Sequence, residues 1–264
     1  METLAGKTAF ITGGSTGIGL GMATTFARHD MNVVITDIRD DALTSAEQHL
    51  RQITARVLTL NVDSTDLDAL ASAAKAVERT FGPLHLLCNN AGVTGGAKVL
   101  DTPEERWRMT HEVNFWGPHN GIKVFLPGML EHGEDAHIVN TASFSGIHGH
   151  GHQSGYGTSK FALVGLSEFL RNDLADTNVG VSVLCPHVVD TPIIKALKTR
   201  VSENVAQMID AMAVAAETVG SQVVRAILAN EFYVFCDGTQ TRKMLEDRCQ
   251  DMMAAMDRQF PKSQ

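Results

Sequence analysis

The sequence has few of the residues and segments that mark several other classes of protein. Among 264 residues there are four cysteines, seven prolines, two tyrosines and two tryptophans. No apolar run approaches the roughly 20 residues that a membrane-spanning helix needs, and no stretch is rich in lysine and arginine. The net charge is −8, so the surface repels phosphate backbones. We therefore expect neither nucleic acid nor membrane as a partner.

The cysteines have no short spacing between them: they are Cys88, Cys185, Cys236 and Cys249. The first three lie inside apolar, strand-like runs, so we expect buried reduced thiols rather than a zinc site or a disulfide framework. The first four residues, Met-Glu-Thr-Leu, carry an acid where a secretory signal has positive charge. A cytoplasmic protein is the expectation.

Short apolar runs alternate with longer helical stretches along the whole chain. Each run is continuously apolar rather than alternating, as expected of parallel strands that are covered on both faces. With no linker or repeat, this pattern predicts an α/β fold, a single Rossmann-like doubly wound domain over 1–264 with a seven-stranded parallel sheet flanked by helices. The runs are 8–12, 32–36, 56–61, 84–89, 137–141, 180–185 and 232–236, and the main helical stretches are 17–29, 42–52, 65–81, 103–130 and 156–173.

Three further segments carry structural expectations. Thr-Pro-Glu-Glu at 102–105 offers a helix N-cap, a proline at the first helical position and a glutamate three residues after the cap. The stretch 190–215 is too long for an ordinary connection, and we expect short mobile helices that cover the substrate. The end of the chain, 239–264, is expected to be a polar helical tail.

A glycine-rich turn follows the first apolar run and opens the first helical stretch. It reads Thr-Gly-Gly-Ser-Thr-Gly-Ile-Gly at 12–19. Small residues let the backbone approach a pyrophosphate, which then lies on the unpaired N–H groups of the helix N-terminus. Glycine clusters alone are weak signals, because tight turns need them anyway, but here the strand–turn–helix context is that of a dinucleotide site. The expected cofactor contacts are Gly13, Ser15, Thr16, Gly17, Ile18 and Gly19.

An acid ends the second apolar run. Asp37 lies eighteen residues after Gly19, where a carboxylate accepts hydrogen bonds from the adenosine ribose and repels a 2′-phosphate. Arg39 is able to pair with a phosphate, but no basic residue lies inside the turn, so we expect NAD rather than NADP. The alternative for Asp37 is a solvated acid at a turn. Asp63, after the third run, either reaches the adenine edge or offsets a helix dipole.

Tyr156 and Lys160 are four residues apart at the start of a helical stretch, so both side chains project from one face. A free tyrosine has a pKa of about 10, and a lysine ammonium one turn away favours the phenolate and lowers that pKa. The pair is suited to exchanging a proton with an alcohol oxygen. Ser143 follows the run 137–141, where its hydroxyl can hold the same oxygen.

Together these residues closely resemble the short-chain dehydrogenase/reductase family, in its smaller single-domain branch. The resemblance extends from Gly6 to about Gly238. The matching elements are the glycine turn at 12–19, Asn-Asn-Ala-Gly at 89–92, Asn114, Ser143, and Tyr-Gly-Thr-Ser-Lys at 156–160.

The resemblance implies a role for each of these residues in an NAD-dependent interconversion of alcohol and ketone. Tyr156 is the acid/base, Lys160 lowers its pKa and binds the nicotinamide ribose, Ser143 orients the substrate carbonyl, and Asn114 holds a water in the proton relay. Thr191 contacts the nicotinamide carboxamide. Further cofactor contacts are expected from Val62, Asp63, Asn90, Ala91, Gly92, Tyr156, Lys160, Pro186 and Val189.

Two features depart from the family pattern or stand outside it. The family usually has Pro-Gly after the sixth strand, and this chain has Pro186-His187; the histidine either packs locally or contacts substrate. His148, His150 and His152 alternate with glycine in a loop. Without a nearby carboxylate they make a poor metal site, so we expect no metal. The loop is either a wall of the substrate site, with His150 in contact, or solvated.

The apolar residues after His187 favour an apolar or aromatic substrate, an aryl or steroid-like alcohol. A homodimer or homotetramer joined through 103–130 and 156–173 is implied by the resemblance. The alternative function is a non-catalytic NAD-binding redox sensor or scaffold, which needs no serine, tyrosine and lysine in this arrangement.

Overall fold

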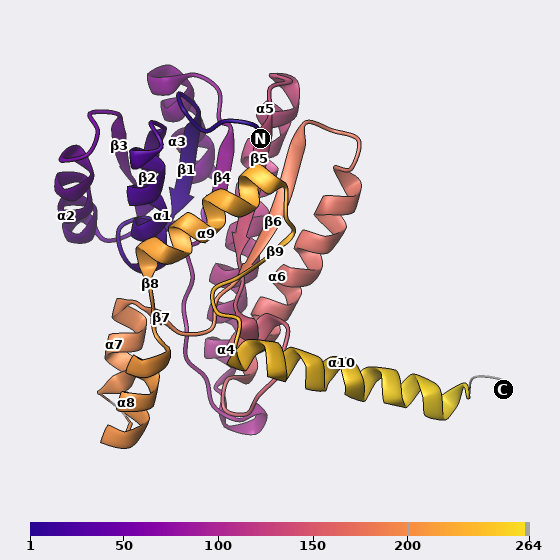
Figure 1. Cartoon of the computed structure of the whole chain (residues 1–264). Coiled ribbons are helices and arrows are strands. Elements are labelled where there is room, and N and C mark those ends of the chain that lie inside the picture. The colour runs from indigo at the N-terminus through magenta and orange to yellow at the C-terminus, as the bar shows by residue number, and fades with distance from the viewer. Residues whose placement is uncertain (200, 262–264) are drawn as a thin grey trace.

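The computed structural model of the chain describes residues 1–199 and 201–261 (Figure 1). A seven-stranded sheet lies at its centre, with strand order β3-β2-β1-β4-β5-β6-β9 and parallel neighbours throughout. This confirms the predicted doubly wound α/β fold. The strands are β1 (Thr8–Thr12), β2 (Asn32–Asp37), β3 (Val57–Asn61), β4 (Leu86–Asn89), β5 (Ala136–Thr141), β6 (Val179–Cys185) and β9 (Tyr233–Phe235). Residue 200, within the predicted segment 190–215, and residues 262–264, at the end of the predicted segment 239–264, lie outside the described residues.

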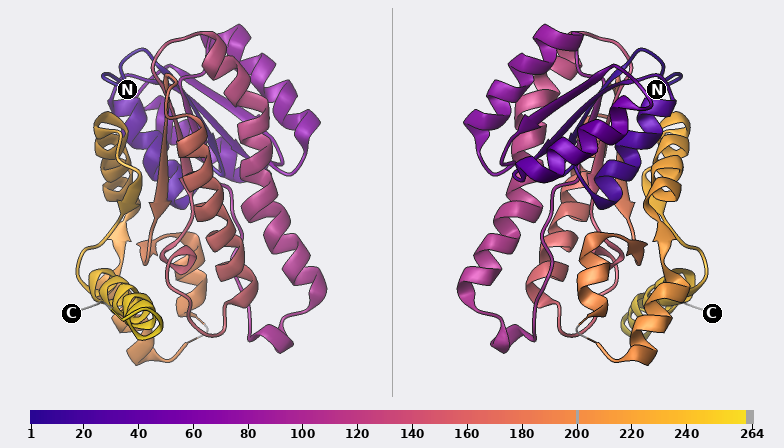
Figure 2. Two further views of the ribbon diagram at one scale, coloured as in Figure 1. Left: turned by 90° about the vertical axis from the view of Figure 1, so that its right-hand side faces the viewer. Right: turned by 90° about the vertical axis from the view of Figure 1, so that its left-hand side faces the viewer.

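Helices cover both faces of the sheet, as Figure 2 shows. On one face α1 (Gly17–Arg28), α2 (Asp40–Arg51) and α9 (Ala216–Ala229) pack against Ile11 and Ile35. On the other, α3 (Leu67–Phe81), α5 (Gly117–Glu131) and α6 (Ser154–Asp173) pack against Phe10 and Val34. Neighbouring strand residues are thus buried on opposite faces, which is why the strands are continuously apolar.

Helices α1 and α9 cross at glycines. A side chain at Gly21 would overlap the backbone oxygen of Ala216, and one at Gly220 would overlap the Thr25 hydroxyl and the oxygen of Gly21. Both positions therefore need glycine for packing rather than for a turn. This close approach fixes α9 over the helix that follows the glycine-rich turn.

The predicted long helix at 103–130 is divided. It comprises α4 (Glu104–His111), a π-helical turn η2 (Glu112–Trp116) and α5. The capping prediction was wrong, because the Thr102 hydroxyl bonds to the oxygen of Lys98 and the N–H of Ala97 instead of a helix terminus. The bond to Lys98 accompanies the short helix η1 (Val99–Asp101), which precedes α4.

Several elements gather at the carboxyl edge of the sheet, at the bottom of Figure 1. The segment after β6 forms a two-stranded ribbon, β7 (Val189–Asp190) with β8 (Val214–Ala215), that carries α7 (Pro192–Lys198) and α8 (Glu203–Met212). The short helices expected there are present. The last helix, α10 (Gln240–Gln259), extends away from the body (Figure 1) and is mostly exposed.

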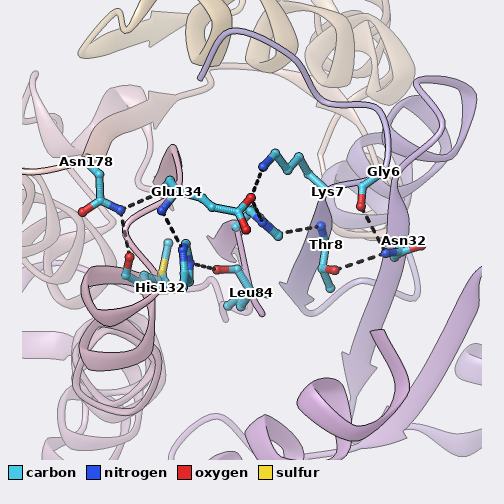
Figure 3. Close-up of polar contacts among 10 residues, drawn as sticks. Gly6, Lys7, Thr8, Asn32, Leu84, His132, Glu134 and Asn178 are labelled. Carbon is cyan, nitrogen blue, oxygen red and sulfur yellow. Dashed lines mark hydrogen bonds and ion pairs between the residues drawn. The ribbon is translucent and has the colours of Figure 1, made fainter. Parts of the chain in front are cut away.

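The opposite, amino edge is tied by a polar cluster (Figure 3). Glu134 pairs with Lys7 and with His85 Nε2, the latter at 3.1 Å. The backbone N–H of Thr8 donates to His85 Nδ1 at 3.2 Å, so His85 is neutral with its proton on Nε2. Lys7 and His85 together lower the pKa of Glu134 to about 2. The cluster connects the start of β1 to the loop that precedes β5.

A second histidine, His137, is fully buried in β5. Its Nε2 lies 2.7 Å from the Ser182 hydroxyl, which itself donates to the oxygen of Glu231. His137 Nε2 therefore carries the proton, and its Nδ1 is buried with no hydrogen-bond partner among the described residues. Burial, with the N-terminal ammonium and Arg171 adding positive charge, lowers its pKa to about 3.

The thiols and apolar segments agree with the sequence. Cys88, Cys185 and Cys236 are free and buried, as predicted, and Cys249 is free and exposed. Within residues 1–199 and 201–261, no helix has the length and apolar character to cross a membrane.

Candidate active site

The glycine-rich turn joins β1 to α1 at the point where the strand order reverses between β1 and β4. Gly13 and Gly17 have φ values of 61° and 55°, a region that favours glycine. A side chain at Gly13 would lie 2.9 Å from the Cα of Ala91, and one at Gly19 would overlap the oxygen of Gly13. The turn therefore consists of small residues, and close neighbours leave no room for larger side chains at Gly13 and Gly19.

The start of α1 is free to bind an anion. Thr16 occupies the N-cap with no side-chain hydrogen bond, and the first turn holds no acid. The first N–H groups of a helix lack partners within it and carry partial positive charge. Backbone of this kind fits a pyrophosphate without any basic side chain.

Asp37, at the end of β2, is 7% exposed and lies directly beside the turn. Its carboxylate accepts hydrogen bonds from the Ser15 hydroxyl and from Arg39, whose Nε lies 3.0 Å away. Burial acts to raise the pKa of Asp37, but the hydrogen bonds from Arg39 and Ser15 outweigh it, so the pKa is lowered. The carboxylate is therefore ionised at neutral pH. Arg39 also reaches the Thr16 hydroxyl at 3.1 Å, so its ion pair with Asp37 lies next to the turn.

The segment after β3 lies alongside. Val62 is buried, and its N–H donates to the oxygen of Asp37 at 3.1 Å. Asp63 is exposed, and its carboxylate accepts from the N–H and hydroxyl of Thr65. The N-cap of α3 is Asp66. Asp63 therefore shapes the turn before the helix, and the helix terminus is capped by another acid.

The segment after β4 closes the other side of the turn. Asn90 Nδ2 donates to the oxygens of Thr12 and Gly13 at 3.0 and 3.1 Å, and the N–H of Ala91 donates to the Thr12 hydroxyl at 3.0 Å. A side chain at Gly92 would lie 3.2 Å from Asn114 Oδ1 and 3.5 Å from Lys160 Nζ. Gly92 thus lies between the glycine-rich turn and the polar residues of η2 and α6.

Asn114 is fully buried within the π-helical turn. Its Oδ1 accepts from the N–H of Val93 at 2.9 Å, and its Nδ2 donates to the oxygen of Val93 and to the Ser159 hydroxyl, both at 3.0 Å. The Ser159 hydroxyl donates in turn to the oxygen of Tyr156 at 2.7 Å. A π-turn adds one residue to a helical turn and is frequent at functional sites; here it aims the amide at the start of α6.

Ser143, Tyr156 and Lys160 come together at the carboxyl end of β5. Ser143 is buried directly after the strand, and its hydroxyl lies close enough to the Tyr156 phenol to act on the pKa of that group. Lys160 is 4% exposed; its Nζ lies 5.8 Å from the centre of the Tyr156 ring and donates to the oxygen of Thr141 at 2.8 Å. The sequence prediction that the tyrosine and lysine share one helix face is confirmed.

The pKa values differ from the sequence expectation. Burial raises the pKa of Tyr156 by more than the Ser143 hydroxyl lowers it, so the net shift is upward. Burial also lowers the pKa of Lys160 to about 8. The expectation that Lys160 brings the pKa of Tyr156 below its usual value was therefore wrong for the protein alone, because desolvation acts on both groups at once.

The segment after β6 contacts both the segment that carries Ser143 and the glycine-rich turn. The oxygen of Pro186 accepts from the N–H of Phe144 at 2.8 Å, which places the next residue, His187, beside Ser143. Val189 is buried, and Thr191 caps α7 through the N–H of Ile194. A side chain at Gly17 would lie 3.1 Å from Thr191 Cγ2, so Thr191 lies against the glycine-rich turn.

The histidines of the loop at 148–152 are arranged differently from one another. His148 stacks on Phe144, with ring centres 6.0 Å apart. His150 is exposed and lies 3.3 Å from Gln153 Oε1, and His152 is exposed with a φ of 66°. Among the described residues, no group of three or more potential metal ligands is present.

Three neighbours of the site were missed by reasoning from the sequence: Phe144, Ser159 and Asp237. Ser159 lies inside the Tyr-to-Lys motif and Phe144 lies next to Ser143, so their positions in the sequence could have identified both. Asp237 Oδ2 lies 3.8 Å from His187 Nδ1. Because the two are remote in the chain, nothing in the sequence pairs them.

These features agree with the comparisons with known proteins. Residues 7–202 match the short chain dehydrogenase family. The chain belongs to this family. Its relatives include the 1-deoxy-11-beta-hydroxypentalenate dehydrogenase of Streptomyces exfoliatus, 34% identical over 93% of this chain and 88% of that protein. The oxidoreductase UcpA of Salmonella typhimurium is 34% identical over 75% of this chain and 74% of that protein.

Solved structures show the same architecture. A short chain dehydrogenase/reductase from Burkholderia phymatum, in complex with NAD, has a TM-score of 0.87 at 31% identity and covers 97% of both chains. The apo form of LigO from Sphingobium sp. strain SYK-6 has a TM-score of 0.88 at 33% identity, over 99% of this chain and 93% of that one. Like these relatives, the chain is an oxidoreductase of the short-chain dehydrogenase type.

Proposed function

We propose that this oxidoreductase interconverts a secondary alcohol and a ketone with NAD, and that Tyr156 is its general acid/base. The observation that supports this most is the meeting of Ser143, Tyr156 and Lys160 beside Gly92. The preceding residue, Ala91, adjoins the glycine-rich turn, whose backbone fits a pyrophosphate. A site that held a dinucleotide only as a sensor would not need these three polar groups at its end.

Each polar group then has a part in moving the proton. In oxidation, the Tyr156 phenolate takes the proton of the alcohol, and in reduction the phenol returns it. Ser143 holds the same substrate oxygen in place. Lys160, as an ammonium below its pKa of about 8, would bind the nicotinamide ribose, and Asn114 positions the start of α6 and a water of the relay. When bound, the nicotinamide accepts or supplies the hydride.

The cofactor would be held by backbone and small side chains. The ionised Asp37 would accept hydrogen bonds from the ribose hydroxyls and disfavour a 2′-phosphate, which supports NAD over NADP. The proposed contacts are Gly13, Ser15, Thr16, Gly17, Ile18, Gly19, Asp37, Val62, Asp63, Asn90, Ala91, Gly92, Tyr156, Lys160, Pro186, Val189 and Thr191.

The substrate is proposed to be an apolar or aromatic alcohol, aryl or steroid-like, in contact with Ser143, His150 and His187. We propose that the segment at 190–215, with α7 and α8, covers it, within one catalytic domain over 1–264. A cytoplasmic homodimer or homotetramer joined through α4, α5 and α6 completes the proposal, with α10 as a tail outside the domain body.

The test is hydride transfer followed by NADH absorbance, with NAD and NADP, across aryl, steroid and aliphatic secondary alcohols. Tyr156→Phe is expected to lower kcat by about 10²–10⁴-fold, the usual contribution of a positioned acid/base, while NAD still binds. Tyr233→Phe is the matched control, since it removes the chain's other phenol and should retain activity. Turnover unchanged in Tyr156→Phe would refute the mechanism. Tight NAD binding without turnover of any alcohol would instead favour the redox sensor.

A further inference from the structure

The aromatic residue next to the proposed catalytic serine contacts the imidazole rings of two histidines. Phe144 follows Ser143, and its ring lies 5.7 Å from that of His187 in an edge-on arrangement. The ring of His148 stacks on it at 6.0 Å with an interplanar angle of 17°. His187 therefore contacts the residue that directly follows the serine whose hydroxyl would hold the reacting oxygen.

His187 is oriented by a carboxylate from a different part of the chain. Asp237 Oδ2 lies 3.8 Å from His187 Nδ1. The other carboxylate oxygen, Oδ1, accepts from the Thr241 hydroxyl at 2.8 Å, and Thr241 is buried in the first turn of α10. Asp237 is thus fixed by the helix that it precedes, and it faces one particular nitrogen of the imidazole.

This arrangement favours one tautomer of His187. A neutral imidazole has one N–H and one bare nitrogen, and a carboxylate beside Nδ1 favours the proton on Nδ1. The bare nitrogen is then Nε2, which accepts a hydrogen bond and cannot donate one. A group that binds His187 in this state has to bring its own proton.

We propose that His187, oriented by Asp237, accepts a hydrogen bond from a second hydroxyl group on the substrate, so that the enzyme prefers secondary alcohols that carry an additional hydroxyl. This inference rests on the proposed function, since it requires the reacting oxygen to lie at Ser143 and Tyr156. His187 would then contact substrate and determine specificity, while Asp237 is a positioning residue that acts through it.

The charges around His187 support the neutral form. Burial lowers the pKa of His187; Asp237 opposes this and His150 adds to it. The ring of His148, which stacks on Phe144, is another ionisable group close by. Because the pKa is below the usual value of about 6.5, His187 is an acceptor at neutral pH and loses that capacity on acidification.

The experiment uses the full chain with NAD and α-methylbenzyl alcohol as the parent probe. Its ortho-, meta- and para-hydroxy derivatives are each compared with the corresponding methoxy derivative, which has a similar shape but no proton to donate. At pH 8, at least one hydroxy derivative should have a kcat/KM about tenfold above its methoxy counterpart, mainly through KM, as one hydrogen bond is worth roughly that factor. Equal values for every pair would overturn the inference.

Variants then assign the preference to His187. His187→Leu should abolish it, measured within that variant as the ratio of kcat/KM between the hydroxy and methoxy derivatives, whatever its rate with the parent alcohol. His187→Gln, whose amide oxygen is an acceptor, should restore part of the ratio. Asp237→Asn keeps the oxygen that binds Thr241 but removes the charge, and should reduce the preference through KM rather than kcat. The matched controls are His29→Leu and Asp176→Asn, both at exposed positions. A preference that persists in His187→Leu would refute the assignment.

The pH dependence separates this binding mode from an anionic one. The KM of the preferred hydroxy derivative should rise as the pH falls through the pKa of His187, with the methoxy derivative unaffected. The carboxy derivative of the same alcohol is measured alongside. If its KM instead falls on acidification, below that of the hydroxy derivative, the imidazolium binds an anion and the inference is overturned. Failure of the wild type to oxidise even the parent alcohol would count against the proposed function itself, for aryl alcohols, and is distinguishable from a mere lack of preference.

Discussion

The buried histidine of β5 should make the protein sensitive to acid. His137 is fully buried, with a pKa of about 3, whereas a histidine in an unfolded chain has a pKa of about 6.5. Between these values the unfolded chain binds a proton that the folded chain does not, so the free energy of unfolding falls as the pH falls. Integrated from neutral pH to pH 4.5, this one group costs about 2.5 kcal/mol of stability, at 1.36 kcal/mol for each pKa unit.

The perturbation that isolates this effect is His137→Gln. Glutamine can still donate to the Ser182 hydroxyl, which accepts from His137 Nε2 in the wild type, but it does not titrate. Urea unfolding followed by circular dichroism, at pH 7 and pH 4.5 and one protein concentration, gives the loss of stability for each protein. The loss should be about 2.5 kcal/mol smaller in the variant than in the wild type, whatever the stability of the variant at pH 7.

The comparison of two pH values protects the test from a packing defect. A poor fit of glutamine lowers stability equally at both pH values and cancels in the difference. His29→Gln, at an exposed position, is the control and should lose as much stability as the wild type. Equal losses in the wild type and His137→Gln would refute the reasoning, because they would show that His137 is protonated in the folded protein or hydrogen-bonded by water at Nδ1.

Two further predictions concern the cofactor. Gly19→Ala should weaken NAD binding more than tenfold by calorimetric titration, because the added methyl overlaps the oxygen of Gly13. Gly128→Ala, with no atom near its added methyl, is the control. An unchanged affinity in Gly19→Ala would contradict the assignment of the turn. Asp37→Asn should weaken NAD binding by about tenfold and strengthen NADP binding, since it leaves Arg39 unpaired beside the turn. If the ratio of the NAD and NADP affinities equals that of the wild type, Asp37 is not the residue that distinguishes the two cofactors.

The parts of the fold that follow from local pattern were predictable. Strands buried on both faces are continuously apolar whatever their neighbours, so all seven strands of the main sheet were found, with ends within two residues of the observed ones. The shared helix face of Tyr156 and Lys160 follows from their spacing alone. The glycine-rich turn was legible because close backbone approach leaves only small residues there.

Features that depend on tertiary contacts were not predictable. The π-helical turn at Asn114 adds a residue to one helical turn, and the stretch 103–130 was interpreted as one uninterrupted helix. Thr102 was expected to cap a helix, but its hydroxyl is used by the preceding short helix. The direction of the Tyr156 pKa depends on how much protein surrounds the phenol, which no motif encodes. The pairing of His187 with Asp237 joins segments that meet only when β6 and β9 lie side by side.

The ribbon of β7 and β8 has an evolutionary consequence. It pairs Val189 with Val214 and Asp190 with Ala215, so the segment that carries α7 and α8 begins and ends at one place, outside the seven-stranded sheet (Figure 1). Beyond it, the glycine crossing of α1 and α9 anchors the chain again. Lengthening, shortening or exchanging the segment therefore leaves the register of the large sheet intact. If the segment covers the substrate as proposed, a lineage can change what the enzyme accepts there while Ser143, Tyr156 and Lys160 stay the same.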